Sequence, residues 1–309
     1  MISHRAKHPR SVFLPLASTA AAALLLTACG ADSDPLEDDE TTQADGDTIV
    51  IGSQAYYSNE IIAEIYAQVL EDEGFEVQRD FQIGQREVYM PELESGEIDL
   101  VPDYTGNLVQ YYSDEADSGS PEEVYEQVGD ALPEGLQALD FAEATDQDSY
   151  TVTSETAEEH DLTTIGDLAN LGDSVTMAAN SEFETRPYGP EGAQELYGVT
   201  IELTGVEDSG GPLTVGALTD GDVQVADIYT SSPAIEAENL VVLEDPEYLV
   251  LPQNVVPVAD EDLDEKAVEA LNEVQAQLGA QDLVELNTRS VEDEAPAADV
   301  AAEWLEQQD

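Results

Sequence analysis

Cysteine and histidine are scarce in this sequence. Of its 309 residues one is a cysteine, Cys29, and three are histidines, of which His160 alone lies beyond the first ten residues. A lone cysteine excludes a disulfide within the chain. Zinc sites and Ser-His or Cys-His catalysis need clustered ligands or a general base, and the acidic EEHD stretch around His160 offers neither. We expect His160 to be a solvated surface residue.

Basic residues are also rare. The chain has 8 Lys and Arg against 70 Asp and Glu, a formal net charge of −62, and the cations beyond the N-terminal segment are Arg79, Arg86, Arg186, Lys266 and Arg289. Such a charge disfavours nucleic acids and anionic substrates as partners. Because the acids are spread through the chain, we interpret them as a solvated surface, suited to high salt or to solubility at a cell envelope.

Phosphate-binding loops are missing too, since neither GxxxxGK[ST] nor GxGxxG occurs and the SGGP at 209–212 is too short to count. We therefore predict a binding protein rather than an enzyme, with no cofactor and no metal. An envelope hydrolase that uses two carboxylates stays an alternative, because 70 acids produce every carboxylate spacing by chance.

The N-terminus has the pattern of an export signal. A basic start is followed by an apolar run over residues 12–26, and small residues lead to Cys29 in the order Leu-Thr-Ala-Cys. That order resembles a bacterial lipobox, so residues 1–28 are predicted to be a lipoprotein signal peptide and Cys29 the lipidated first residue of the mature chain. Residues 29–47 then form an acidic linker, and the protein is predicted to be lipid-anchored on the extracytoplasmic face of the cell membrane.

From Thr48 onward, apolar strand-like runs alternate with segments of helical periodicity. TIVIGSQ is followed by the helical SNEIIAEIYAQVLEDEG, for example, and SPEEVYEQVGDAL has Ser120 as its N-cap. The same alternation restarts beyond Asp148. It predicts an α/β fold with mostly parallel sheets and helices on both faces, whose ligand lies beyond the carboxyl ends of the strands.

A short internal repeat indicates which strand ends meet the ligand. LESGEIDLVPDYT at 93–105 aligns with LTDGDVQVADIYT at 218–230, and Tyr104 and Tyr229 occupy the same place at the end of a strand. If the two copies belong to two facing lobes, these tyrosines face each other. The alternative is that helix-Gly-strand chemistry is common and the matching tyrosines are coincidental.

Arg186 is the sole cation between Asp148 and Tyr229, and it lies in SEFETRPYG, directly after the strand SVTMAAN. A guanidinium at that end of a strand is placed to bind a carboxylate through two hydrogen bonds. Because the chain has so many acids, a structural ion pair is the alternative role for this arginine.

Several of these segments are similar to those of one family. IGSQAYYSNEIIAEIYAQVLE and SGEIDLVPDYTGN, together with DQDSYTV, NSEFETRPYG and ADIYTS, resemble segments of the lipoprotein substrate-binding proteins of osmoprotectant ABC importers, which bind glycine betaine, choline and related quaternary ammonium solutes. The resemblance implies a two-lobed periplasmic-binding-protein-like fold of type II, each lobe a mixed, mostly parallel sheet flanked by helices. Lobe 1 is expected to comprise residues 48–146 plus 234–309, and lobe 2 residues 147–233.

The resemblance also implies a site between the lobes, in which a cage of tyrosines holds the quaternary ammonium group. The positions that match the cage are Tyr104, Tyr150 and Tyr229. Asp148 resembles an acidic residue of the family's site, and Arg186 resembles the arginine that takes a betaine carboxylate.

At other positions the sequence departs from the family pattern. Gln54 and Asn107 stand where family members often have Lys and Thr that help to hold the ligand, and Gln253 and Asn254 stand where another aromatic residue is expected. The candidates for the missing aromatic wall are Tyr56, Tyr57, Tyr188 and Tyr248.

The implied function is delivery of glycine betaine, or a similar quaternary ammonium solute such as choline or carnitine, to the permease of an ABC importer. Aromatic rings suit this ligand, because a trimethylammonium group has no hydrogen-bond donor and is recognised through its diffuse charge. Two alternatives stay open besides the hydrolase. One is a receptor for a zwitterionic or cationic amino acid, for which Gln54, Asn107 and Arg186 matter more than rings, and the other is a passive surface lipoprotein.

Overall fold

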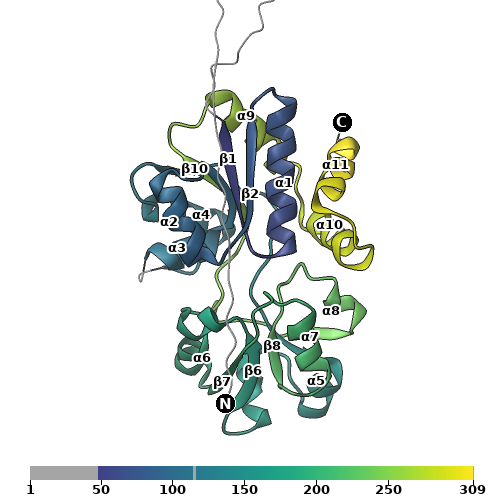
Figure 1. Ribbon diagram of the computed structural model, residues 1–309. Coiled ribbons are helices and arrows are strands. Elements are labelled where there is room, and N and C mark those ends of the chain that lie inside the picture. The colour runs from purple at the N-terminus through teal and green to yellow at the C-terminus, as the bar shows by residue number, and fades with distance from the viewer. Residues whose placement is uncertain (1–47, 114–115, 309) are drawn as a thin grey trace, which may run out of the picture. The chain divides into compact units, whose positions relative to one another are not determined.

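The computed structural model of the chain describes residues 48–113 and 116–308, which belong to one compact unit (Figure 1). The predicted signal peptide, Cys29 and the acidic linker lie outside the described residues. The described strands form two five-stranded sheets. No helix within the described residues is both long and apolar enough to cross a bilayer.

The first sheet has the strand order β2-β1-β3-β10-β4. Its strands are β1 (Ile49–Gln54), β2 (Val77–Gly84), β3 (Leu100–Tyr104), β4 (Leu136–Ala138) and β10 (Val255–Asp260). β1 runs parallel to β2 and β3, whereas β10 runs antiparallel to β3 and β4. The central strand β3 ends at Tyr104, whose backbone pairs with Val255 at the start of β10.

Helices cover both faces of this sheet (Figure 1). One face carries α1 (Tyr57–Asp72), α9 (Glu265–Gln275), α10 (Ala280–Glu292) and α11 (Ala297–Gln308), and the other carries α2 (Arg86–Ser95), α3 (Thr105–Tyr112) and α4 (Pro121–Ala131). α1 buries Ile61, Ile62 and Ile65, which recur at helical spacing. α4 begins at Pro121 after a capping box formed by Ser120 and Glu123, which confirms the predicted N-cap.

The side chains of β3 alternate between the two faces, as the two-residue period of a strand requires. Leu100 and Tyr104 pack into the core beneath α1, whereas Val101 packs into the core beneath α2, α3 and α4. Asp103 shares the face of Val101 and is completely buried. The last two residues of β3 therefore send a ring and a carboxylate to opposite sides of the sheet.

The second sheet has the strand order β7-β6-β8-β5-β9. Its strands are β5 (Tyr150–Thr153), β6 (Val175–Ala179), β7 (Ile201–Gly205), β8 (Val225–Asp227) and β9 (Leu240–Val242). Around them lie α5 (Ser154–His160), α6 (Pro190–Tyr197), α7 (Pro212–Thr219), α8 (Ala234–Ala237) and the 3₁₀ segments η1 (Ile165–Leu171) and η2 (Ser181–Thr185). β6 is parallel to β7 and β8, and β5 is antiparallel to β8 and β9.

The chain returns to the first sheet later than the sequence predicted. The boundary at residue 234 is wrong, because β9 pairs with β5, with Thr151 opposite Val242. β9 supplies hydrogen-bond partners to the backbone groups on the side of β5 that faces away from β8. Leu240–Val242 therefore belong to the second sheet. An isolated bridge between Thr145 and Asn254 shows where the segment that leaves the first sheet and the segment that returns to it run side by side.

Candidate functional site

A cavity lies between the two sheets, and residues from both contribute to its lining. The lining residues are Gln54, Tyr56, Gln85, Arg86, Tyr104, Asn107, Asp146, Asp148, Asn180, Glu182, Phe183, Arg186, Tyr188, Asp227, Tyr229 and Gln253. Gln54, Tyr104 and Asp227 are the last residues of β1, β3 and β8, so the carboxyl ends of these strands meet the cavity, as the α/β alternation predicts. Six of the seven predicted binding residues line it, and Tyr150 does not.

Tyr104 and Tyr229, the tyrosines that the repeat paired, both line this cavity. The ring of Tyr56 lies edge-on to that of Tyr229, with the ring centroids 5.2 Å apart. The hydroxyl of Tyr56 is hydrogen-bonded to that of Tyr104 and donates to Asp146 Oδ2 at 3.0 Å. Tyr104 is 3% exposed, because its ring also closes the edge of the core beneath α1. Three rings from distant parts of the chain therefore form one continuous wall.

The phenol groups of this wall stay protonated. Burial, and next to it the negative charge of Asp146, raise the pKa of Tyr104 and of Tyr56 far above the ordinary value. Their rings are therefore uncharged at any physiological pH, with electron-rich faces that attract a cation.

Tyr150 has a different place from the one predicted. Its side chain is 1% exposed and packs in the core of the second sheet, where its hydroxyl donates to the backbone oxygen of Tyr188 at 2.7 Å. Its ring lies 6.0 Å from that of Phe183. β5 directs this side chain onto a covered face of the sheet, so Tyr150 supports the segment that carries Phe183 and Tyr188 and is not itself a wall.

The second sheet contributes Phe183 and Tyr188 to the cavity from the turn around η2. Their rings lie 5.6 Å apart at an interplanar angle of 73°. The turn is tight, because a Cβ at Gly189 would lie 2.0 Å from the backbone oxygen of Phe183. Of the four candidates for the missing wall, Tyr56 and Tyr188 line the cavity, whereas Tyr57 and the 58% exposed Tyr248 do not.

Four carboxyl groups line the cavity beside these rings: Asp146, Asp148, Glu182 and Asp227. Asp227 is 3% exposed and accepts a hydrogen bond from the backbone N–H of Ser149 at 3.0 Å. Burial, and next to it the negative charge of Asp148, raise the pKa of Asp227 well above its usual range. Burial likewise raises the pKa of Asp146 and of Glu182. The cavity is therefore strongly acidic, and a cation inside it would relieve the repulsion.

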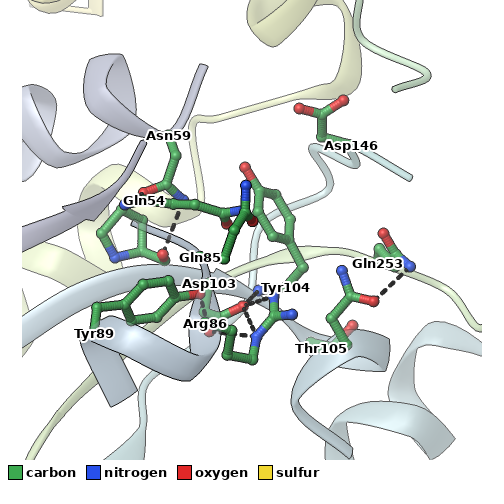
Figure 2. Close-up of polar contacts among 12 residues, drawn as sticks. Gln54, Asn59, Gln85, Arg86, Tyr89, Asp103, Tyr104, Thr105, Asp146 and Gln253 are labelled. Atoms are coloured by element: carbon green, nitrogen blue, oxygen red, sulfur yellow. Dashed lines mark hydrogen bonds and ion pairs between the residues drawn. The ribbon is translucent and has the colours of Figure 1, made fainter. Parts of the chain in front are cut away.

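The first of the two guanidinium groups in the lining is already paired. Arg86 donates to Asp103 from Nη2 at 2.6 Å and from Nε at 3.1 and 3.2 Å, and Tyr89 donates to the same carboxylate at 2.8 Å (Figure 2). Both members of this ion pair are buried, at 3% and 0% exposure. The same carboxylate accepts a hydrogen bond from the backbone N–H of Tyr104 at 2.7 Å.

Arg186 takes the structural role that the sequence left as the alternative. Its Nη1 lies 2.7 Å from Glu87 Oε1, and its Nη2 donates to Glu87 Oε2 at 3.2 Å. Glu87 belongs to α2, so this pair joins the two lobes at the edge of the cavity. Binding of a ligand carboxylate by Arg186 stays a prediction, and it would have to compete with Glu87.

Amide side chains complete the lining. Gln253 Nε2 donates to Asn107 Oδ1 at 2.9 Å and to Asp148 Oδ2 at 3.1 Å, and Asn107 Nδ2 donates to the same carboxylate oxygen at 3.3 Å. Asn107 therefore holds Asp148 in place. Gln54 Nε2 donates to Gln85 Oε1 at 2.7 Å, while Gln54 Oε1 is buried without a hydrogen-bond partner. Gln54 and Asn107, which stand where the family often has Lys and Thr, therefore carry amide groups with different hydrogen-bond partners.

Sequence reasoning missed several of these residues. Phe183 and Glu182 lie in SEFETRPYG, the segment singled out for Arg186, and the segment itself was the available signal. Asp227 lies two residues before Tyr229 in the repeat, but nothing separates it from the 70 acids of the chain until burial is known. No group of three His, Cys, Asp or Glu side chains placed to hold a metal ion occurs within 48–113 and 116–308.

The chain is similar to several known proteins. Residues 47–307 match the family model described as the substrate binding domain of ABC-type glycine betaine transport systems. The glycine betaine-binding protein YehZ of Escherichia coli (strain K12) is 26% identical over 274 residues, which cover 84% of this chain and 90% of that protein.

Solved structures show a similar fold. A glycine betaine/carnitine/choline ABC transporter structure has a TM-score of 0.68 at 20% identity, covering 84% of this chain and 98% of that chain. Lactococcal OpuAC, in its closed-liganded conformation with glycine betaine, has a TM-score of 0.60 at 13% identity, covering 85% and 96%. The predicted two-lobed fold of type II, with mixed sheets flanked by helices, is confirmed.

Proposed function

This chain belongs to the family of substrate-binding domains of ABC-type glycine betaine transport systems, and we propose that it captures a quaternary ammonium solute in the acidic, ring-lined cavity. The family is one of binding proteins, so the chain is a receptor and not an enzyme. We further propose that it is anchored through a lipid on Cys29 at the extracytoplasmic face of the membrane and delivers its solute to an ABC permease.

The observation that carries the proposal is the convergence of five aromatic rings and four carboxyl groups on one cavity. A trimethylammonium group has a methyl surface and a spread charge, and each ring contributes about 0.5 to 2 kcal/mol to its binding. Five rings together contribute about 2.5 to 10 kcal/mol before the costs of ordering, and the attraction between the cation and the carboxylates of the lining adds to this. Glycine betaine is a solute of this class, as are choline and carnitine.

Calorimetry on the purified protein tests this proposal. We expect saturable binding with at least one of glycine betaine, choline and carnitine, and none with proline. The rival ligand is a cationic amino acid, which the acidic cavity also favours by charge. Binding of arginine without any signal from the quaternary ammonium solutes would overturn the proposal and favour that receptor.

The Asp227 carboxyl predicts a pH dependence of ligand binding. Burial and the charge of Asp148 raise the pKa of Asp227, so below that pKa the empty cavity carries a proton there. A bound cation then lacks one counter-charge. The affinity for a quaternary ammonium solute is therefore expected to increase as the pH rises through the raised pKa, and to level off above it.

The stability of the empty protein should change in the opposite direction. Above the ordinary pKa of aspartate, about 3.9, the unfolded chain has released the proton that folded Asp227 retains, so the free energy of unfolding falls as the pH rises to the raised pKa. Calorimetry and thermal unfolding over this pH range measure both trends. Asp227→Asn should make both pH dependences weaker without abolishing them, because burial also raises the pKa of Asp146 and of Glu182. The exposed control Asp222→Asn should leave both unchanged. Profiles of Asp227→Asn that match the wild type would contradict the assignment.

A further inference from the structure

We infer that Asp146 is the positioning residue of the wall that Tyr56, Tyr104 and Tyr229 form, and that it thereby determines how strongly the cavity prefers a fully N-methylated cation. The inference rests on the proposed function and deepens it, because it names the residue that arranges the rings. Two observations carry it: the place of Asp146 where the two lobes join, and the hydrogen bonds that its carboxylate accepts.

Asp146 lies where the segments that connect the two sheets run side by side. It belongs to the segment between β4 and β5, and its backbone N–H donates to the backbone oxygen of Gln253 at 3.2 Å. Gln253 belongs to the segment that leads back to β10. Asp146 is 3% exposed and lines the cavity. The backbone therefore holds this carboxylate beside the cavity, at the junction of the two lobes.

One oxygen of the carboxylate controls two of the three rings. Asp146 Oδ2 accepts from the Tyr56 hydroxyl at 3.0 Å, and that hydroxyl is also hydrogen-bonded to the hydroxyl of Tyr104. Since a phenol has a single proton, Tyr56 donates to Asp146 only when it accepts from Tyr104. Both hydroxyl protons are therefore directed along one chain that ends on Asp146, and this chain fixes the two rings relative to each other.

The other oxygen holds the segment that carries Tyr229. Asp146 Oδ1 accepts from the backbone N–H of Ser231, two residues beyond Tyr229, at 3.0 Å. Ser231 is also held by Asn287 of α10, whose Nδ2 donates to Ser231 Oγ at 2.6 Å. The ring of Tyr229 in turn lies edge-on to that of Tyr56. The two oxygens of Asp146 therefore hold parts of the wall that belong to different lobes.

This arrangement requires a carboxylate. The ion pairs of the described residues do not include Asp146, and hydrogen bonds compensate the burial of its side chain. An ionised carboxylate accepts at both oxygens, whereas an amide must turn its NH₂ group toward one of the two donors. Asp146→Asn therefore breaks one of the two contacts, and Asp146→Ala breaks both.

Calorimetry with two solutes tests the inference on the full chain. The first solute is whichever of glycine betaine, choline and carnitine binds most tightly, and the second is its analogue with one N-methyl group removed, a protonated amine at neutral pH. Rings held in place favour the first, because its additional methyl group spreads the charge over the surface that they contact. In Asp146→Ala the ratio of the two affinities should fall at least about threefold. An unchanged ratio would overturn the inference.

A second carboxylate of the lining separates positioning from charge. Glu182 lines the same cavity, and its Oε1 accepts from Asn180 Nδ2 at 3.1 Å. Glu182→Ala also removes a negative charge, so it should weaken the binding of both solutes by a similar factor and leave their ratio unchanged. An equal fall of the ratio in Glu182→Ala and in Asp146→Ala would reduce the role of Asp146 to its charge, against the inference.

A double substitution tests whether Asp146 acts through Tyr56. Tyr56→Phe removes the hydroxyl that Asp146 holds, and it should weaken binding of the quaternary solute several-fold when it is the only change. In the Asp146→Ala background the same substitution should cost less than about twofold, because the contact is already lost. Equal losses in the two backgrounds would refute the connection. If Asp146→Ala does not fold, Asp146→Asn replaces it, with a smaller fall of the affinity ratio expected because one contact remains.

Near-ultraviolet circular dichroism of the ligand-free protein measures the positioning without a solute. The tyrosine signal should decrease in Asp146→Ala while the far-ultraviolet spectrum stays the same, because the rings lose their fixed surroundings and the secondary structure does not change. An unchanged tyrosine signal would count against the inference. If the wild-type protein binds none of the three solutes, the proposed function fails, and this spectrum still decides whether Asp146 positions the rings.

Discussion

Replacing Tyr229 by alanine is expected to weaken binding of a quaternary ammonium solute by about 2 kcal/mol, or roughly 30-fold. Tyr229 lines the cavity two residues beyond the end of β8, and its ring lies edge-on to that of Tyr56 with the centroids 5.2 Å apart. The loss is placed at the upper end of the range for one ring, because desolvation of the bound cation strengthens its attraction to a ring face. Calorimetry on the purified variant measures it.

Two matched substitutions show whether the loss of affinity comes from removing the ring of Tyr229. Tyr229→Phe keeps the ring and should retain most of the affinity, because the face of the ring and not the hydroxyl contacts the cation. Tyr248→Ala removes a tyrosine that is 58% exposed and lies outside the cavity, and should have no effect on binding. An affinity of Tyr229→Ala equal to that of the wild type would refute the proposed aromatic site. An equally large loss of affinity in Tyr229→Phe would mean that the hydroxyl, and not the ring face, binds the ligand.

The second large effect is expected from the buried ion pair between Asp103 and Arg86, of which Arg86 lines the cavity. Asp103→Ala leaves Arg86 charged and unpaired in the protein interior, and the free energy of unfolding should fall by about 3 to 5 kcal/mol. The same change removes the acceptor of the Tyr89 hydroxyl and of the Tyr104 backbone N–H. Urea unfolding monitored by circular dichroism gives the magnitude.

A double substitution separates the pair from the packing around it. In Arg86→Met with Asp103→Leu both charges disappear, and most of the lost stability should return, because an apolar replacement of a buried pair is often close to neutral. The exposed pair of Lys266 and Glu73 supplies the control: Glu73→Gln should cost less than about 1 kcal/mol. A similar loss of stability in Asp103→Ala and in Glu73→Gln would mean that burial does not determine the strength of the Arg86–Asp103 pair.

Much of the fold could be predicted from local pattern. The helix α4 begins where the Ser120 cap and the Pro121 position indicated, because a cap acts on the backbone groups of its own first turn. The lobe boundary was placed too early, because the pairing of β9 with β5 joins residues about 90 positions apart and leaves no mark on either segment alone.

The site shows the same division. Tyr104 and Tyr229 were found because the internal repeat places each at the carboxyl end of a strand, and strand ends in a sheet of this kind meet the ligand cavity. Tyr150 was chosen on resemblance, but it belongs to the core behind Phe183 and Tyr188. Which side of a strand is covered depends on the helices that pack there, and the sequence of the strand does not name them.

The sequence by itself determined the class of chemistry. The chain has one cysteine, and one histidine beyond its first ten residues, which leaves few routes to catalysis, and the excess of acids disfavours anionic partners. Those conclusions follow from composition, which folding does not alter. The tertiary structure alone decided which charges are free: Arg86 and Arg186 are engaged by Asp103 and Glu87, whereas Asp148 and Asp227 share an acidic cavity. That pairing depends on contacts between distant segments, such as the 99 positions that separate Glu87 from Arg186, and those contacts exist only in the folded chain.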